Sequence, residues 1–88
     1  MRRDPQFILS DVAGSHILVP VGKLAVDFNG VVSLNDMGVV LWNLLENDTT
    51  QEALLAAVLA EYEVTAEQAG TDIADFLEQL RAAGCLEE

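Results

Sequence analysis

Hydrophobic positions along this chain follow two different periods, and the change between them falls within residues 28–42, FNGVVSLNDMGVVLW. Before this segment, β-branched and other apolar residues alternate with polar ones or run together, which is typical of strands. After Asn35, apolar residues recur at spacings of three and four, which is typical of an amphipathic helix. The pattern therefore predicts strands first and helices afterwards.

Extended segments are predicted before Asn35: Phe7–Val12, His16–Pro20, Lys23–Phe28 and Val31–Leu34. Ala13-Gly14-Ser15 favours a turn after the first segment. Asn29-Gly30 favours a tight type I′ turn before the last, because both residues tolerate positive φ. The length of the third segment leaves open whether it extends the preceding strand or forms a separate one. In the last strand, the period of two places Val32 and Leu34 on one face.

The first helix is predicted to begin after Asn35, a good N-cap, with Asp36 adding negative charge to the first turn. Its apolar face is expected to contain Met37, Val40, Leu41, Leu44 and Leu45, with Trp42 beside them. Gly38 lies in the first turn, where the missing side chain would permit close packing.

Two further helices each begin with a capping box, the first at Thr49 and Glu52 and the second at Thr65 and Gln68. The second helix is expected to carry Leu55, Val58, Leu59 and Tyr62 on one apolar face, with Leu54 beside them. The third has a longer apolar face, formed by Ala69, Ile73, Phe76, Leu77 and Leu80. Gly84 suits the left-handed residue that ends such a helix.

The chain is expected to form one domain over residues 1–88, since it is short, 51% apolar and without a linker. The predicted class is α+β, with a small antiparallel sheet followed by three helices. The third helix is the best candidate to lie against the sheet, because its apolar face is the longest. Residues 1–6 are expected to be flexible.

The charge of the chain is strongly negative, at −11 from 15 acidic and 4 basic residues. Nucleic-acid-binding proteins neutralise phosphates with clustered Lys and Arg, and here only Lys23 and Arg81 lie beyond the first few residues. The same charge disfavours an anionic membrane surface. Basic peptides and basic protein faces are the partners that it favours, although acidity also keeps small domains soluble.

Residues with catalytic or metal-binding chemistry are few in this sequence. His16 is the only histidine, and Cys85 is the only cysteine. Neither has nearby partners at the spacing that zinc requires, and two acidic neighbours, Glu87 and Glu88, would raise the pKa of the Cys85 thiol. No phosphate-binding glycine motif is present. We therefore expect a protein that is not an enzyme and that binds no cofactor or metal. The single thiol and the lack of a signal peptide suggest a cytoplasmic protein.

Acyl carrier proteins are also small and acidic, and they attach phosphopantetheine to a serine in an Asp-Ser-Leu setting at the start of a helix. Ser33 precedes Leu34 here, but Val32 occupies the position of the aspartate. The strands predicted in the first third also do not suit a four-helix bundle. The sequence therefore disfavours an acyl carrier.

The chain resembles the PqqD-like family, also called RiPP precursor-peptide recognition elements, from about Phe7 to Leu86. The resemblance rests on the order and spacing of several short segments rather than on any one of them. They are Ile17–Pro20, Val32–Asn35, Val40–Leu45, Thr50 with Ala53 and Leu54, Tyr62, Asp72 to Leu80, and Gly84–Leu86.

This resemblance implies a winged helix-turn-helix fold, with a three-stranded antiparallel sheet ahead of three helices. It also implies a non-catalytic module that binds the leader segment of a ribosomally made precursor peptide and presents it to a modifying enzyme, possibly a radical-SAM enzyme. In this family the leader adds a strand beside the third strand and lies against the third helix.

The resemblance places the peptide-binding residues on two elements. The edge strand would contribute Val31, Val32, Ser33 and Leu34, and the third helix would contribute Asp72, Ile73, Asp75, Phe76, Gln79 and Leu80. Helical spacing adds that Ile73 and Leu77 are mostly core, so Phe76 and Leu80 are the better candidates to line the groove. The sequence leaves open which edge of the sheet is free.

Two other functions stay open on the sequence alone. One is an acidic docking subunit that assembles with an enzyme without touching a precursor. The other is a winged-helix DNA-binding regulator, which Asp72, Asp75 and Glu78 on the third helix disfavour because they would repel phosphate. A monomer and a homodimer are both compatible with an open sheet edge.

Overall fold

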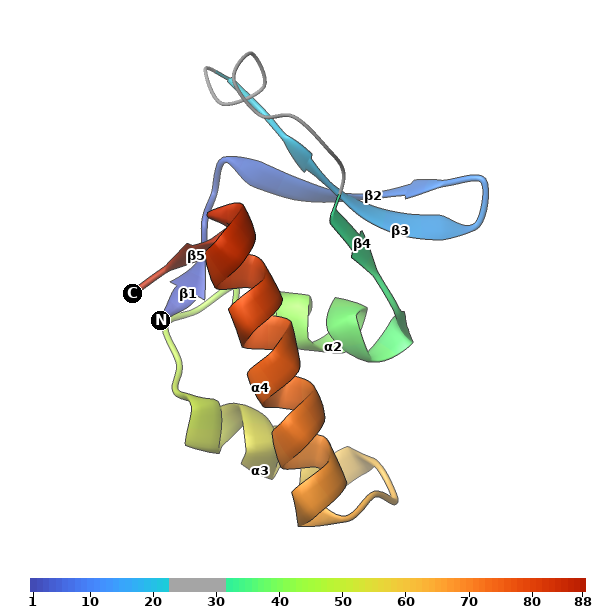
Figure 1. The fold of residues 1–88 in the computed structure, drawn as a ribbon, viewed down its shortest axis with the longest axis vertical. Helices are drawn as coiled ribbons and strands as arrows, with labels where there is room; N and C mark the ends of the chain where they lie inside the picture. The colour runs from blue at the N-terminus through green and yellow to red at the C-terminus, as the bar shows by residue number, and fades with distance from the viewer. Residues whose placement is uncertain (23–31) are drawn as a thin grey trace.

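The structure is a computed structural model that describes residues 1–22 and 32–88. Its elements follow the order β1 (Arg2–Arg3), β2 (Phe7–Val12), β3 (Ser15–Pro20), β4 (Val32–Leu34), α2 (Asp36–Leu44), α3 (Gln51–Glu61), α4 (Ala66–Ala83) and β5 (Leu86–Glu87) (Figure 1). The predicted α+β class, with strands ahead of helices, is confirmed. The expectations for Lys23–Phe28, for the Asn29-Gly30 turn and for Val31 lie outside the described residues.

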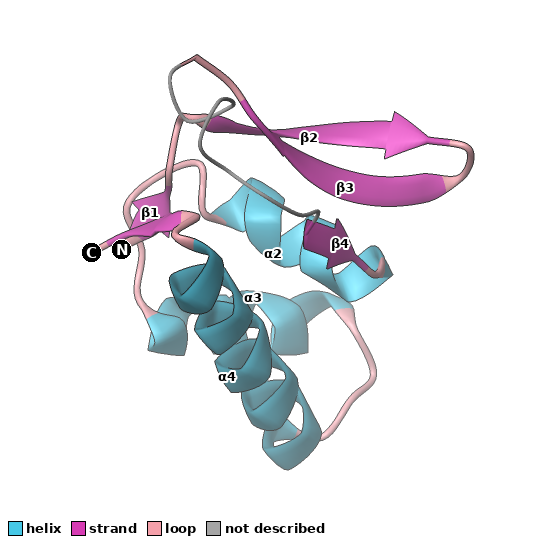
Figure 2. Cartoon of the chain, turned by 45° about the horizontal axis from the view of Figure 1, so that its top comes forward, coloured by secondary structure: helices cyan, strands magenta, loops and turns pink. Residues whose placement is uncertain are grey.

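The main sheet is antiparallel in the order β2-β3-β4. A two-residue turn joins β2 to β3, with Ala13 at φ 52° and Gly14 at φ 83°, which are the positive values that a type I′ turn requires. The register pairs Leu9 with Leu18, and Leu18 with Val32, so these residues share one face of the sheet. The three helices lie on one side of the sheet (Figure 2).

Helix boundaries follow the predicted caps with one shift. The Asn35 side chain accepts a hydrogen bond from the Gly38 amide at 2.7 Å, and the Thr65 hydroxyl accepts one from the Gln68 amide at 3.1 Å. The cap predicted at Thr49 is wrong by one residue, because Thr50 accepts from the Ala53 amide at 3.1 Å instead. Gly84 ends α4 at φ 74°, as predicted.

The apolar faces of the helices were predicted with uneven success. All five residues expected on the face of α4 are buried. In α2, Leu41 and Leu45 are buried with Trp42, whereas Leu44 is 38% exposed. In α3, the core receives Leu54 and Val58, while Leu59 and Tyr62 are each 39% exposed. The apolar faces predicted for these two helices are therefore buried only in part, and Leu44, Leu59 and Tyr62 lie outside the core.

One hydrophobic core joins the sheet to the helices. Phe7, Leu18, Val32 and Leu34 reach it from the sheet, and the three helices supply most of the remainder. Helix α4 meets β4 directly, since Gln79 Nε2 donates to the Ser33 carbonyl oxygen at 3.4 Å. This contact agrees with the prediction that the third helix lies against the sheet and positions the site described below.

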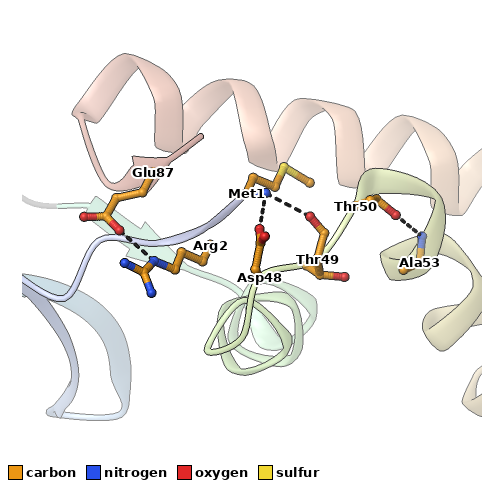
Figure 3. A network of polar contacts seen from close by, with 7 residues as sticks. All are labelled: Met1, Arg2, Asp48, Thr49, Thr50, Ala53 and Glu87. Atoms are coloured by element: carbon orange, nitrogen blue, oxygen red, sulfur yellow. Dashed lines mark hydrogen bonds and ion pairs between the residues drawn. The ribbon is translucent and has the colours of Figure 1, made fainter.

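The first residues of the chain differ from the flexible segment that the sequence suggested. Strand β1 pairs with β5 in a second, two-stranded sheet, with Arg2 opposite Glu87 and Arg3 opposite Leu86. The Met1 ammonium donates to Asp48 Oδ1 at 2.6 Å and to the Thr49 carbonyl at 3.0 Å (Figure 3). The hydrogen bond from the Met1 ammonium, followed by its positive charge, lowers the pKa of the Asp48 carboxyl. Residues at the two ends of the chain thus lie side by side.

Arg3 joins this small terminal sheet to α2. Its Nη1 donates to the Trp42 carbonyl oxygen at 3.1 Å, and its guanidinium lies 5.5 Å from the centroid of the Trp42 ring. Trp42 is itself 1% exposed, so Arg3 covers the edge of the core.

Candidate functional site

A groove of about 540 Å³ opens between β4 and α4 and reaches the first half of α2. We call it the β4–α4 groove. It is lined by Ser33, Leu34, Asn35, Met37, Gly38, Leu41, Asp72, Asp75, Phe76 and Gln79. Two consecutive elements, β4 and α2, therefore form one concave surface with the distant helix α4, and this surface lies beside an edge of the main sheet.

The β4 wall of the groove presents a backbone edge. Among the described strands, β4 pairs only with β3, so its other side is not covered by a further described strand. The hydrogen bond from Gln79 to the Ser33 carbonyl indicates that this carbonyl points away from β3. In an antiparallel pair the amide and carbonyl of one residue point the same way, so the Ser33 amide also faces the groove.

The α4 wall is a single stripe of the helix. Asp72, Asp75, Phe76 and Gln79 are spaced three, four and seven residues apart, which places them on one face. Phe76 is 8% exposed, so it supplies an apolar surface that is mostly supported by the core. The two aspartates and Gln79 are exposed around it. An apolar centre with a polar rim is typical of a binding surface.

Gly38 on the α2 side lets the three elements approach closely. A Cβ atom at this position would lie 3.2 Å from Leu34 Cβ, 3.2 Å from Phe76 Cε1 and 3.3 Å from Asn35 Oδ1. These distances are shorter than ordinary van der Waals contact, so a larger residue would require these side chains to shift by a few tenths of an ångström. The close packing expected at Gly38 is confirmed.

Six of the ten candidate site residues line this groove: Ser33, Leu34, Asp72, Asp75, Phe76 and Gln79. Val32 points into the core at 7% exposure, and Ile73 and Leu80 are buried at 1% and 0%. The expectation that Leu80 lines the groove is therefore not met, whereas the core positions of Ile73 and Leu77 are confirmed. Val31 lies outside the described residues.

Sequence reasoning did not assign Asn35, Met37, Gly38 and Leu41 to the site. The sequence pattern predicts them correctly as parts of a helix and its cap, but it does not show that they also line a groove. The signal that was available is Gly38, because a glycine in the first turn of a helix permits another element to approach.

The groove is negatively charged. Among residues 1–22 and 32–88, Asp72 and Asp75 are the only acidic or basic residues that line it, and Asp72 also accepts a hydrogen bond from Gln68 Nε2 at 2.9 Å. His16 lies in a neighbouring shallow hollow, where Nδ1 contacts Asp11 and Nε2 is 3.6 Å from Asp36 Oδ1. The arrangement therefore favours binding of neutral or cationic groups.

The cysteine, whose side chain could in principle react or bind a metal, lies outside the groove. Cys85 is fully buried, and burial followed by the charge of Asp4 raises the pKa of its thiol to about 11. A thiol with that pKa is protonated at neutral pH and is a poor nucleophile. Within residues 1–22 and 32–88, no three histidine, cysteine or acidic side chains are grouped so as to hold a metal ion.

Comparison with known protein families decides which family this fold belongs to. Residues 15–86 match the family described as coenzyme PQQ synthesis protein D (PqqD). The chain belongs to the PqqD family. This match begins at β3 and ends within β5, so it includes all ten residues that line the β4–α4 groove.

Two solved structures share this PqqD fold. One is TbiB1 in complex with the TbiA(beta) leader peptide, with a TM-score of 0.75 and 24% identity over 99% of this chain and 95% of that chain. The other is a lasso peptide synthetase B1 complexed with the leader peptide, with a TM-score of 0.73 and 21% identity over 99% of this chain and 96% of that chain. No curated protein matches this sequence.

These structures extend the PqqD likeness to β1 and β2, which precede the family match. None of the helices in the described part of the chain is both long and apolar enough to cross a membrane.

Proposed function

We propose that this PqqD-family protein binds the leader segment of a ribosomally synthesised precursor peptide in the β4–α4 groove. The observation that carries the proposal is the juxtaposition of the β4 backbone edge with the apolar surface of Phe76. The two similar structures, each described as a complex with a leader peptide, support the same assignment.

Strand addition is the binding mode that this groove favours. A leader strand placed beside β4 would satisfy the outward amide and carbonyl of Ser33, and its alternate side chains would reach the groove. The side-chain amide of Gln79, now 3.4 Å from the Ser33 carbonyl, would move or share that acceptor. This contact is long for a hydrogen bond, so its loss costs little.

The apolar part of the groove supplies most of the affinity. Each new backbone hydrogen bond contributes about 1 kcal/mol net, whereas association costs about 4 kcal/mol or more. Because β4 has three residues, the backbone alone does not overcome this cost. Burying two or three leader side chains at about 1.5–3 kcal/mol each brings the dissociation constant to about the micromolar range.

The protein acts in this proposal as a non-catalytic adaptor. Among its described lining residues, the groove holds no nucleophile or acid–base pair suited to chemistry on a peptide, and its two aspartates lie on an open rim. A separate modifying enzyme, for example a radical-SAM enzyme, would act on the precursor while the leader is held. Such a division of work requires only that the leader be bound and the rest of the precursor be left free.

A titration followed by NMR tests the proposal. The probe is a synthetic leader peptide from a precursor gene near the gene of this protein, added to the isotope-labelled chain. We expect the amide resonances of β4 and of residues 72–79 in α4 to shift in a saturable manner. Shifts confined to α3, or no shifts for any neighbouring precursor, would contradict it.

A docking subunit that never binds a precursor is the second candidate. It is favoured by Ile8 and Val12 on β2, which are 50% and 53% exposed and suit a protein contact. In that case substitutions of Ile8 would abolish enzyme binding while leader peptides left the spectrum of β4 unchanged.

A further inference from the structure

We propose that the β4–α4 groove selects leader strands that place a lysine or arginine side chain against Asp72 and Asp75. This inference rests on the proposed function and adds the chemical class of peptide that the groove takes. It depends on the shape of the groove and on the charges that face it.

The two aspartates lie on the same face of α4, close enough in helical spacing for one cation to reach both. They are three residues apart on α4, which separates them by about 4.5 Å along the helix axis. Both side chains are exposed, and both line the groove. Among the ion pairs of residues 1–22 and 32–88, none involves either aspartate. A guanidinium group, with five donors in a planar fork, can contact both carboxylates at once.

The charges that oppose this preference are weaker. The first turn of α2 faces the groove through Met37 and Gly38, and a helix N-terminus has about half a positive charge. Asn35 already accepts from the Gly38 amide, and Asp36 places a full negative charge in the same turn. His16 lies in the adjacent hollow beside two carboxylates of its own, Asp11 and Asp36. Of the charges on the described residues, the two carboxylates of α4 therefore set the sign of the groove.

The apolar centre of the groove fits the stem of the same side chain. Phe76 follows Asp75 directly, and Met37 on α2 also lines the groove. Lysine and arginine can pack their methylene groups on such a surface while the charged end reaches the rim. A glutamate at the same position of the leader would meet two like charges, so the groove would discriminate against acidic strands.

The net charge of the whole protein acts in the same direction but is less specific. At −11, the chain attracts any basic peptide from a distance and speeds encounter at low salt. Selection by the groove differs from this general attraction because it depends on two named carboxylates. The experiment must therefore compare charges inside and outside the groove.

A random dodecapeptide library, displayed on phage, provides the test. It is selected in parallel on the unmodified protein and on the double variant Asp72→Asn, Asp75→Asn, which keeps the shape of both side chains. We expect lysine or arginine at one recurrent position among peptides from the unmodified protein and no such preference among those from the double variant.

Matched single variants separate the groove from the overall charge. Asp75→Asn removes one charge inside the groove, and Glu78→Gln removes one from the same helix outside it. A selected basic peptide, synthesised with a fluorescent label, should bind Asp75→Asn about 3- to 5-fold more weakly at low salt, and Glu78→Gln with less than about a 2-fold change. Equal weakening by both variants would overturn the inference.

Two further results would also overturn it, with different consequences for the proposed function. Selected peptides that shift the resonances of β4 but lack a recurrent basic residue would remove the charge selectivity alone. Failure to recover any peptide that shifts β4 and α4 would remove strand addition as well.

Discussion

At the scale of single residues, Phe76 contributes both to the packing of the core and to the surface proposed to bind the peptide. It lines the groove, yet it is 8% exposed and belongs to the core. Leu80, one turn later on the same helix, is fully buried and does not line the groove. These two residues therefore allow the contribution of the groove to be separated from that of the core.

We predict that Phe76→Leu weakens leader binding about 3- to 10-fold, because the shorter side chain offers less apolar surface to the peptide. Its stability should fall by about 1 kcal/mol, since most of the buried volume is kept. Leu80→Ala should instead lose about 2–5 kcal/mol of stability and leave the affinity of the folded protein unchanged. Urea denaturation and peptide titration measure the two effects, and equal loss of affinity in both variants would contradict the assignment.

Cys85 gives a pH-dependent prediction. Burial raises the pKa of its thiol from 9.0 to about 11 in the folded protein. The unfolded chain therefore releases this proton first, and the free energy of unfolding should fall as the pH rises from about 9 to about 11. Comparison with Cys85→Ala, by urea denaturation at several pH values, isolates this contribution. A parallel pH dependence in both proteins would show that the thiol does not contribute.

At the scale of elements, β4 is the strand that must accept the leader. Ser33 lies opposite Ile17 in the register, and its carbonyl points toward Gln79 rather than toward β3. Its amide is therefore available for a peptide without loss of the pairing inside the sheet.

We predict that Ser33→Pro reduces leader affinity at least about tenfold, because proline removes the amide that an added strand requires. The fold should survive, since this amide is not used in the β3–β4 pairing. Ser33→Ala is the matched control and should bind within about 2-fold of the unmodified protein. Unchanged affinity of a folded Ser33→Pro variant, measured by fluorescence anisotropy, would exclude strand addition at this residue.

The elements also show how far the sequence predicts this fold. The face of α4 was predicted correctly because its apolar residues are separated by charged ones. Helix α3 has apolar residues on nearly every side, including Leu54, Leu55, Val58 and Leu59, so its periodicity did not identify the buried face. The Thr49 cap failed because Thr50 follows it and satisfies the same geometry one residue later.

The candidate site was predicted in part and for a specific reason. Family resemblance placed Ser33, Phe76 and Gln79 correctly beside one another, but it did not separate groove residues from core residues on α4. Leu80 lies four residues after Phe76, which is too close in helical spacing for the sequence to distinguish their environments. The contribution of α2 depends on how three elements pack, and local pattern does not encode that.

At the scale of the whole molecule, the two ends of the chain form a second sheet that the sequence did not predict. Its strands have two residues each, too few for a periodic pattern, and they pair across the full length of the chain. Arg3 connects this sheet to Trp42 in the core, whereas Arg2 makes an exposed ion pair with Glu87 at 2.8 Å.

We predict that Arg3→Ala lowers the free energy of unfolding by about 1–2 kcal/mol, because a hydrogen bond and a cation–π contact are lost together. Arg2→Ala should change it by less than about 0.5 kcal/mol, since exposed ion pairs contribute little. Urea denaturation compares the two. Equal effects would indicate that total charge, rather than the contact with Trp42, sets the contribution of this segment.

The whole arrangement leads to one claim, that the β4–α4 groove receives a foreign strand. Intermolecular NOEs between an unlabelled leader peptide and the isotope-labelled protein test it most directly. If the leader binds in this groove, we expect NOEs from the peptide backbone to the backbone of Ser33. We also expect NOEs from peptide side chains to Phe76 and Met37. NOEs that instead place the peptide on the outer face of α3 or along β2 would contradict it.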